Sequence, residues 1–129
     1  MIKKNICFNG STGSLGSLMP RNKNLIPCFA RSNDSDLKID SEIKNSNPHT
    51  FIHMAALTDI QQCENFPERA REMNVEFPLR ILKHAIKNEV QRFIFISSSH
   101  VYKPTDSLIK IKSSDKPDPQ NSYGKSKLE

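Results

Sequence analysis

The chain has 129 residues, of which 36% are hydrophobic and 26% charged, and its formal net charge is +5. This length allows one domain, and no apolar run approaches the roughly 20 residues that a membrane helix needs. The apolar patch at the N-terminus ends at Gly10, which argues against a signal peptide. Three cysteines without a Cys-x-x-Cys spacing argue against a disulfide scaffold, so we expect a soluble cytoplasmic protein.

The positive charge is spread along the chain. Only Lys3 and Lys4 are adjacent lysines, and most other basic residues alternate with acids and amides. Nucleic-acid binding needs basic residues that cluster on one face, so we expect no nucleic-acid partner and no membrane partner. An ordinary basic surface explains the charge, and a preference for an anionic ligand fits it equally well.

Four short apolar runs are typical of β-strands. They cover residues 2–8, 25–30, 51–54 and 93–96. Between the first two, only residues 14–19 can form a helix before Pro20, which allows one or two turns. A polar turn over 32–36 and a short helix over 41–45 precede the third run, and the Asn-Pro at 47–48 ends that helix.

Helical periodicity is strongest over residues 67–88. There Val75, Leu79, Leu82 and Ile86 form one apolar stripe. Pro78 lies inside the pattern and predicts a kink, or two helices that meet there. The segment 103–121 holds three prolines and is predicted to be a loop, and residues 122–129 are predicted to be the first turns of a helix.

Strands that alternate with helical segments are typical of βαβ units. We therefore predict an α/β fold with a doubly wound, mostly parallel sheet. The predicted strand order is 3-2-1-4, numbered along the chain. Cys7 and Cys28 are expected in the core, and Cys63 is expected to be exposed. We expect no metal site, because His49 and His53 flank a strand start and do not share a helix face.

Gly10, Gly13 and Gly16 directly follow the first strand and open the short helix. Glycine permits a tight turn and lets the backbone approach a pyrophosphate, which then meets free N–H groups at the helix N-terminus. This context predicts a dinucleotide site, and a Gly/Ser-rich surface turn is the alternative.

Two further groups of residues carry possible chemistry. Tyr123 and Lys127 are four residues apart, so they share one face of a helix. A nearby ammonium lowers the pKa of a phenol, which can then exchange a proton with a carbinol while a hydride moves. Residues 97–99 are serines at the carboxyl end of the fourth strand, where a hydroxyl can hold a substrate oxygen. Taken singly, an exposed helix start and a serine-rich turn explain these residues better.

Together and in this order, the three motifs resemble the extended short-chain dehydrogenase/reductase family of NAD(P)-dependent sugar-nucleotide epimerases, dehydratases and reductases. UDP-galactose 4-epimerases and dTDP-4-dehydrorhamnose reductases are the branches that the chain looks most like. The matching segments are 9–16, 36–37, 51–59, 74–75, 95–102 and 122–129. The resemblance implies a Rossmann-like NAD(P)-binding domain over residues 1–129 and hydride transfer to or from a nucleotide-sugar substrate.

The resemblance also implies a role for each matching residue. Tyr123 would be the acid/base, and Lys127 would lower its pKa and hold the nicotinamide ribose. Ser98 would orient the reacting oxygen, or Ser99 if the turn is one residue shorter. The other residues expected at the cofactor are Gly10, Thr12, Gly13, Ser14, Leu15, Gly16, Met54, Ala55, Ala56, Thr58 and Asn74, with Asp36 and Leu37 at the adenine.

The end of the second strand bears on the choice between NAD and NADP. It has no acid; Arg31 can bind a 2′-phosphate in a bidentate manner, and Ser32 can donate a further hydrogen bond. Asp34 and Asp36 lie 18 and 20 residues after Gly16, near the usual place of the acid that binds the ribose of NAD. We expect NADP over NAD, and Arg31 as a solvated turn residue is the alternative.

The chain departs from the family pattern at three places. Lys103 replaces the glycine of the family's Val-Tyr-Gly, the first helix is short, and the sequence stops in the first turns of the Tyr123 helix. Family members continue with the rest of that helix, which commonly builds a homodimer, and with a substrate-binding lobe. We therefore expect an incomplete domain whose Tyr123 helix lacks the packing that fixes it. The alternative function is a truncated, non-catalytic dinucleotide-binding fragment.

Overall fold

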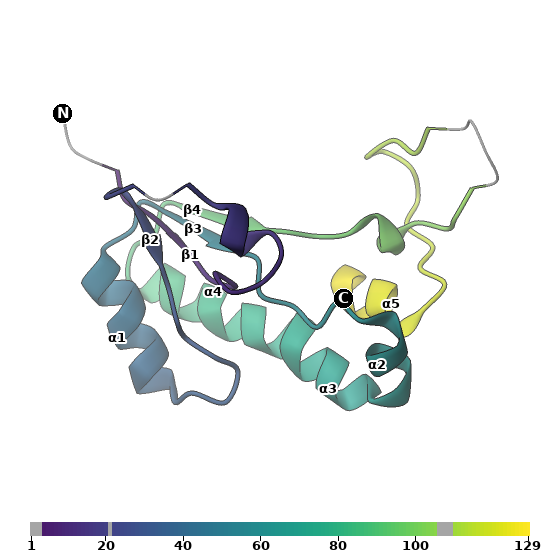
Figure 1. Ribbon diagram of the computed structural model, residues 1–129, viewed down its shortest axis with the longest axis horizontal. Coiled ribbons are helices and arrows are strands. Elements are labelled where there is room, and N and C mark those ends of the chain that lie inside the picture. Colours follow the sequence, from purple (N-terminus) through teal and green to yellow (C-terminus); the bar gives the residue numbers. More distant parts are fainter. Residues whose placement is uncertain (1–3, 21, 106–109) are drawn as a thin grey trace. The chain divides into compact units, whose positions relative to one another are not determined.

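A computed structural model describes residues 4–20, 22–105 and 110–129 of the chain (Figure 1). The chain divides into two compact units. Unit 1 comprises the described residues of Met1–Ala56 and Glu76–Ile96, and unit 2 those of Leu57–Val75 and Ser97–Glu129. Within the described ranges, no helix is both long enough and apolar enough to cross a membrane.

Unit 1 is built on a four-stranded sheet in which every pair of neighbouring strands is parallel. The strands are β1 (Ile6–Phe8), β2 (Leu25–Pro27), β3 (Thr50–His53) and β4 (Arg92–Phe95). The predicted α/β class and parallel sheet are confirmed. Strands β1 and β2 are shorter than predicted, since β1 starts at Ile6 and β2 ends at Pro27, whereas β3 and β4 each start one residue earlier than predicted.

The predicted strand order 3-2-1-4 is wrong, because the observed order is β2-β1-β3-β4. Pro27 explains why β2 is an edge strand. The next residue, Cys28, donates its N–H to the carbonyl of Phe8 in β1 at 2.7 Å, so Pro27 stands at the position turned away from β1. A proline nitrogen has no hydrogen to donate to a further strand on that side. Phe51 in β3 is fully buried, as a strand with neighbours on both sides requires.

Helices α1 (Asp36–Ser46) and α4 (Phe77–Lys87) lie on one side of this sheet (Figure 1). Between them Ile39, Ile43 and Ile81 are fully buried. Helix α1 starts five residues before the helix predicted over 41–45, because the Ser35 hydroxyl accepts the N–H of Lys38 as an N-cap. It ends where Asn47 adopts a left-handed conformation with φ 40°.

The predicted apolar stripe faces the core only in part: Val75, just before α4, is buried and Leu82 is half-buried. Leu79 is 58% and Ile86 68% exposed, whereas Phe77, Ile81 and Ala85 are buried. The cause is a wide π-helical turn, η2 (Glu72–Glu76), between α3 (Pro67–Arg71) and α4. Such a turn inserts one residue and rotates the face of everything after it. The interruption of the helix that Pro78 predicted is therefore present, but it ends before Pro78. Pro78 lies in the first turn of α4, where its missing N–H breaks no helical hydrogen bond.

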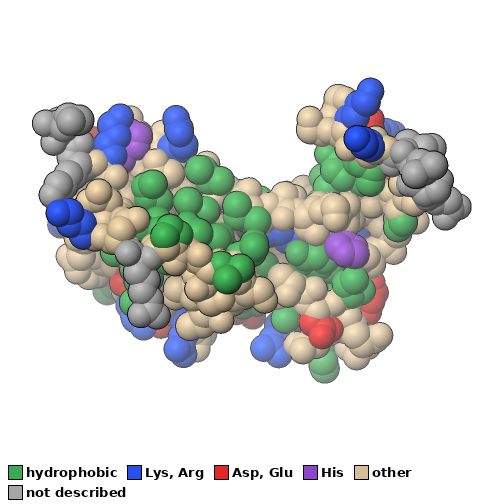
Figure 2. Space-filling model, turned by 45° about the horizontal axis from the view of Figure 1, so that its top comes forward, with side chains coloured by type: hydrophobic (Ala, Val, Ile, Leu, Met, Phe, Trp, Pro, Cys, Tyr) green, Lys and Arg blue, Asp and Glu red, His purple; other side chains and the backbone are tan. Residues whose placement is uncertain are grey.

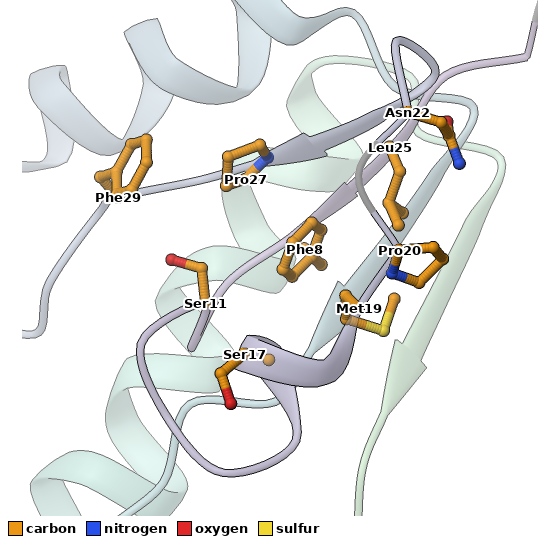
Figure 3. A pocket seen from close by; sticks show the side chains of 10 residues that line it. Phe8, Ser11, Ser17, Met19, Pro20, Asn22, Leu25, Pro27 and Phe29 are labelled. Atoms are coloured by element: carbon orange, nitrogen blue, oxygen red, sulfur yellow. The ribbon is translucent and has the colours of Figure 1, made fainter.

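In unit 1 some side chains of the sheet are partly exposed, among them Ile94 and Phe95 of β4 at 36% each. The first helix is reduced to a single 3₁₀ turn, η1 (Gly16–Leu18), before Pro20. Hydrophobic side chains gather on this unit's surface (Figure 2). A groove with a volume of about 620 Å³ lies where Phe8 and Leu25 of the strands meet Met19 and Pro20. Figure 3 shows the side chains that line it.

Unit 2 consists of short helices around a small core. Besides α3 these are α2 (Ile60–Asn65), η3 (Ser99–Val101) and α5 (Ser122–Leu128). Cys63, Ala70 and Tyr123 form the core, and Leu57 packs against it. Cys63 is thus buried and not exposed as expected, because α2, which the sequence did not predict, turns it inward. Helix α5 and the loop over the described residues of 103–121 are as predicted.

Candidate functional site

The glycine-rich loop of residues 9–16 folds tightly back on itself after β1. The N–H of Gly13 donates to the carbonyl of Gly10 at 2.9 Å. Gly10 has φ +73°, and a Cβ there would lie 2.9 Å from the backbone nitrogen of Ala55. A Cβ at Gly16 would lie 2.1 Å from the Gly10 carbonyl oxygen. Both positions therefore require glycine, one for its backbone conformation and both for the close approach.

Asn9 ties this loop to the segment after β3. Its Oδ1 accepts the N–H groups of Met54 at 2.8 Å and Ala55 at 3.1 Å, and its Nδ2 lies 2.9 Å from Nδ1 of His53. The side chain is fully buried. The sequence analysis missed Asn9, although a polar residue directly after a buried strand signals that it has buried partners. As a result, two segments predicted to line the cofactor, the glycine loop and Met54–Ala56, lie side by side.

The loop tip is open to solvent. Thr12, Gly13, Ser14 and Leu15 are exposed. Leu37, expected at the adenine together with Asp36, is 83% exposed and leaves apolar surface at the start of α1. These residues of unit 1 are accessible to a ligand, as a cofactor site requires.

The acids between β2 and α1 are bound within the protein. The Asp34 carboxylate accepts the ammonium of Lys38 at 2.9 Å and the N–H of Arg31 at 2.8 Å, and these hydrogen bonds lower its pKa. The Asp36 carboxylate accepts Nη2 of Arg80 at 2.8 Å and its Nε at 3.0 Å, and this guanidinium lowers the pKa of Asp36. The side chain of Arg31 is exposed, and Ser32 is half-buried.

In unit 2, Tyr123 and Lys127 lie one turn apart on α5, as predicted. Tyr123 is 8% and Lys127 5% exposed. Burial lowers the pKa of the Lys127 ammonium to about 8. The Tyr123 ring meets the ring of His100 edge-on, with centroids 5.6 Å apart. The pair therefore combines a phenol with an ammonium that titrates near neutrality.

The expectation that α5 lacks the packing to fix it is wrong within unit 2. The Glu64 carboxylate accepts both the N–H of Ser122 at 2.7 Å and its hydroxyl at 2.9 Å, which lowers the pKa of Glu64. The Asn121 side chain caps the helix by accepting the N–H of Gly124 at 2.7 Å. Seven residues thus form an anchored helix because neighbouring segments satisfy its first turn.

Ser98 stands at the start of η3, where its hydroxyl accepts the N–H of His100 at 3.2 Å. The turn packs on α5, since a Cβ at Gly124 would lie 2.1 Å from the carbonyl oxygen of His100. The turn of Ser98 and the helix of Tyr123 are therefore held together in one unit. The sequence analysis missed His100 and Gly124, although a glycine inside a helix marks either a close approach or a weak point.

Asn74 lies in the wide turn η2 and is almost fully buried. Its Oδ1 accepts the N–H of Leu57 at 2.8 Å, and its Nδ2 lies 3.0 Å from the Leu57 carbonyl and 2.9 Å from the hydroxyl of Ser126 in α5. Thr58 follows Leu57 and is exposed. These contacts hold the turn and α5 together; the role of Asn74 and Thr58 at a cofactor stays a prediction.

Within the described part of the chain, no group of three His, Cys, Asp or Glu side chains could hold a metal.

The free energy of unfolding is expected to rise between pH 8 and pH 10.5 because of Lys127. Below pH 8 the folded state holds a buried ammonium that the unfolded chain exposes to water, which costs stability. Above the folded pKa of about 8 the folded state has lost this proton, whereas the unfolded lysine keeps it up to about 10.5, so the penalty disappears. Urea unfolding across this range should show the rise in wild type and in Lys125→Met, an exposed lysine of the same helix, and a smaller rise in Lys127→Met. An equal rise in all three chains would contradict the assignment.

Comparison with known proteins gives related sequences and structures over the whole chain. A family model described as the RmlD substrate binding domain matches residues 4–129. A dTDP-4-dehydrorhamnose reductase of Bacillus anthracis, solved with NADP, is 23% identical with a TM-score of 0.83, and the match covers 99% of this chain and 48% of that one. The corresponding reductase of Yersinia enterocolitica is 31% identical with a TM-score of 0.76, over 98% of this chain and 46% of that one.

Among curated proteins, the chain is similar to the beta subunit of methionine adenosyltransferase 2 from Bos taurus. The two are 28% identical over 141 residues, which cover 98% of this chain and 41% of the bovine protein. The chain therefore spans slightly less than half the length of these relatives.

Proposed function

Because the chain belongs to the family of RmlD substrate binding domains, we propose that it is the dinucleotide-binding part of a sugar-nucleotide reductase or epimerase. The resemblance to extended short-chain dehydrogenases and the Rossmann-like class are confirmed by the family match and the solved reductases. The observation that carries the proposal is the close approach of the glycine loop to Met54–Ala56. Glycines that leave no room for a Cβ beside an exposed loop tip fit the pyrophosphate of a dinucleotide.

The proposed cofactor is NADP in preference to NAD. Asp34 and Asp36 would be the natural acceptors for the ribose hydroxyls of NAD, but both carboxylates are already bound by cations of the protein. The exposed guanidinium of Arg31 is then well suited to a 2′-phosphate, and Ser32 can donate one further hydrogen bond. The solved neighbours contain either dinucleotide, NADP in the reductase of Bacillus anthracis and NAD in MoeE5, so they support a nicotinamide dinucleotide in general.

The proposed chemistry resides on α5 and η3. Tyr123 would donate a proton to the substrate oxygen or remove it, and Lys127 one turn away would hold the nicotinamide ribose. Ser98 would hold the same oxygen in place. A bound nicotinamide supplies the hydride.

In the complete protein we propose a nucleotide-sugar substrate and a homodimer. The three cysteines form no disulfide, which fits a cytoplasmic location.

A binding role without turnover is the second candidate. The curated relative is named as a subunit of methionine adenosyltransferase 2, so similarity to this chain does not by itself imply a reductase. In this case the glycine loop would bind the dinucleotide and Tyr123 would transfer no proton.

An assay with NADPH and dTDP-4-dehydrorhamnose distinguishes the two candidates. Oxidation of NADPH by the chain, at least about a hundredfold slower in Tyr123→Phe, would support the reductase. Binding of NADPH without oxidation would support a binding role for the chain by itself. A folded chain that neither binds nor oxidises NADPH would contradict both.

A further inference from the structure

Arg80 of α4 reaches across to the loop that joins β2 to α1. Its Nη1 donates to the carbonyl of Ser32 at 2.6 Å, and its Nη2 donates to the carbonyl of Asp34 at 2.7 Å. Nη2 and Nε also bind the carboxylate of Asp36 at 2.8 and 3.0 Å. One guanidinium, two-thirds buried, thus holds three acceptors of a single short segment.

This arrangement fixes the loop more firmly than an ordinary surface ion pair. Two of the three acceptors are backbone carbonyls, so Arg80 restrains the path of the chain as well as a side chain. The same segment forms a turn over residues 31–34, which is closed by the N–H of Asp34 donating to the carbonyl of Arg31 at 3.1 Å. The N–H of Arg31 in turn donates to the carboxylate of Asp34. Arg31 and Ser32 are therefore presented from a loop whose geometry is set in advance.

Arg80 also changes the charge that a ligand meets. Without it, the carboxylate of Asp36 would keep only the His84 ring, 3.6 Å away, as a partner at the start of α1, and it would repel a phosphate and attract a ribose hydroxyl. With it, this carboxylate is neutralised by the cation that also orders the backbone. Neutralising the Asp36 carboxylate favours the binding of an anionic group beside Arg31. Ordering the loop before the ligand binds also favours it, because less conformational entropy is then lost on binding.

We propose that Arg80 is a positioning residue that sets the selectivity for a 2′-phosphorylated dinucleotide by acting through loop 31–36. This inference rests on the proposed function, because it takes the loop to be part of the dinucleotide site. Arg80 itself contacts protein groups and acts on the ligand only through Arg31, Ser32 and the neutralised Asp36.

The test compares the dissociation constants of NADPH and NADH for wild type, Arg80→Gln and Arg80→Lys. In Arg80→Gln we expect NADPH to bind about tenfold more weakly, the scale of one hydrogen bond to a charged group, with little change for NADH. Arg80→Lys keeps the positive charge but lacks the planar guanidinium, so its affinity for NADPH should lie between those of wild type and Arg80→Gln. The ratio of the two constants is the readout, because a partly unfolded variant weakens both ligands equally.

Lys87→Gln is the matched control. Lys87 lies on the same helix and binds Asp40 of the same partner helix at 2.8 Å, but it does not reach the loop. If Arg80 merely joined α1 to α4, both glutamine variants would leave the ratio unchanged, which would overturn the inference. If wild type binds neither dinucleotide, the proposed function fails and the inference with it.

Hydrogen exchange gives a readout that needs no ligand. The amides of Arg31 and Asp34 should exchange faster in Arg80→Gln than in wild type or Lys87→Gln. Unchanged exchange in this segment would show that Arg80 does not order the loop, whatever the binding ratio.

Discussion

Gly124→Ala is expected to destabilise unit 2 by about 3 kcal/mol, the upper end of what overpacking costs. Within an ordinary helix the same change stabilises by up to about 1 kcal/mol, so the sign of the effect is diagnostic. The new Cβ would lie 2.1 Å from the carbonyl oxygen and 2.9 Å from the carbonyl carbon of His100. These are backbone atoms, which cannot rotate aside as a side chain can. Helix α5 would have to move away from η3, and Tyr123 would leave its contact with His100.

Thermal unfolding and hydrogen exchange of residues 97–102 and 122–128 measure this effect. The exchange should rise in both segments of Gly124→Ala. Lys125→Ala is the control, because it places alanine at the next position of α5, where the side chain is exposed. A Gly124→Ala chain as stable as Lys125→Ala would mean that α5 and η3 do not pack as described.

Gly13→Asp is expected to abolish dinucleotide binding, whereas Gly13→Asn should retain much of it. Gly13 is exposed at the loop tip, and a Cβ there would lie 3.3 Å from the Gly10 carbonyl, so the fold accommodates either side chain with a small shift. The two residues have nearly the same size and differ in charge. A carboxylate about 4 Å from a phosphate costs about 4 kcal/mol at a protein surface, close to a thousandfold in affinity.

Titration of both variants with NADPH, followed by the fluorescence of the nicotinamide, measures the difference. Circular dichroism shows whether each variant is folded. Equal affinities for Gly13→Asp and Gly13→Asn would mean that the pyrophosphate does not bind at this loop.

Features written into short stretches of sequence could be predicted. The glycine loop depends on the spacing of its glycines, and the four strands depend on short apolar runs. The Tyr123 helix depends on the cap at its first turn. The order of the strands depends on pairing between distant segments, so alternation alone did not determine it. Pro27 carried the missing signal, because a proline excludes the interior position that the order 3-2-1-4 assigned to its strand.

Another error came from the wide turn at Glu72–Glu76, whose added residue changes which face of α4 turns inward. The apolar stripe was predicted for one uninterrupted helix, so part of it lies on the exposed face of α4. Asn9 and Arg80 were missed for a different reason. Their partners lie more than 40 residues away, so the local sequence does not identify the backbone groups that these side chains meet.

Calorimetric titration of the wild-type chain with NADPH, and with NADH in parallel, shows whether the proposed dinucleotide site exists. We expect binding at one site with a dissociation constant in the micromolar range, tighter for NADPH and lost in Gly13→Asp. Absence of binding for both dinucleotides, with circular dichroism showing a folded chain, would contradict it.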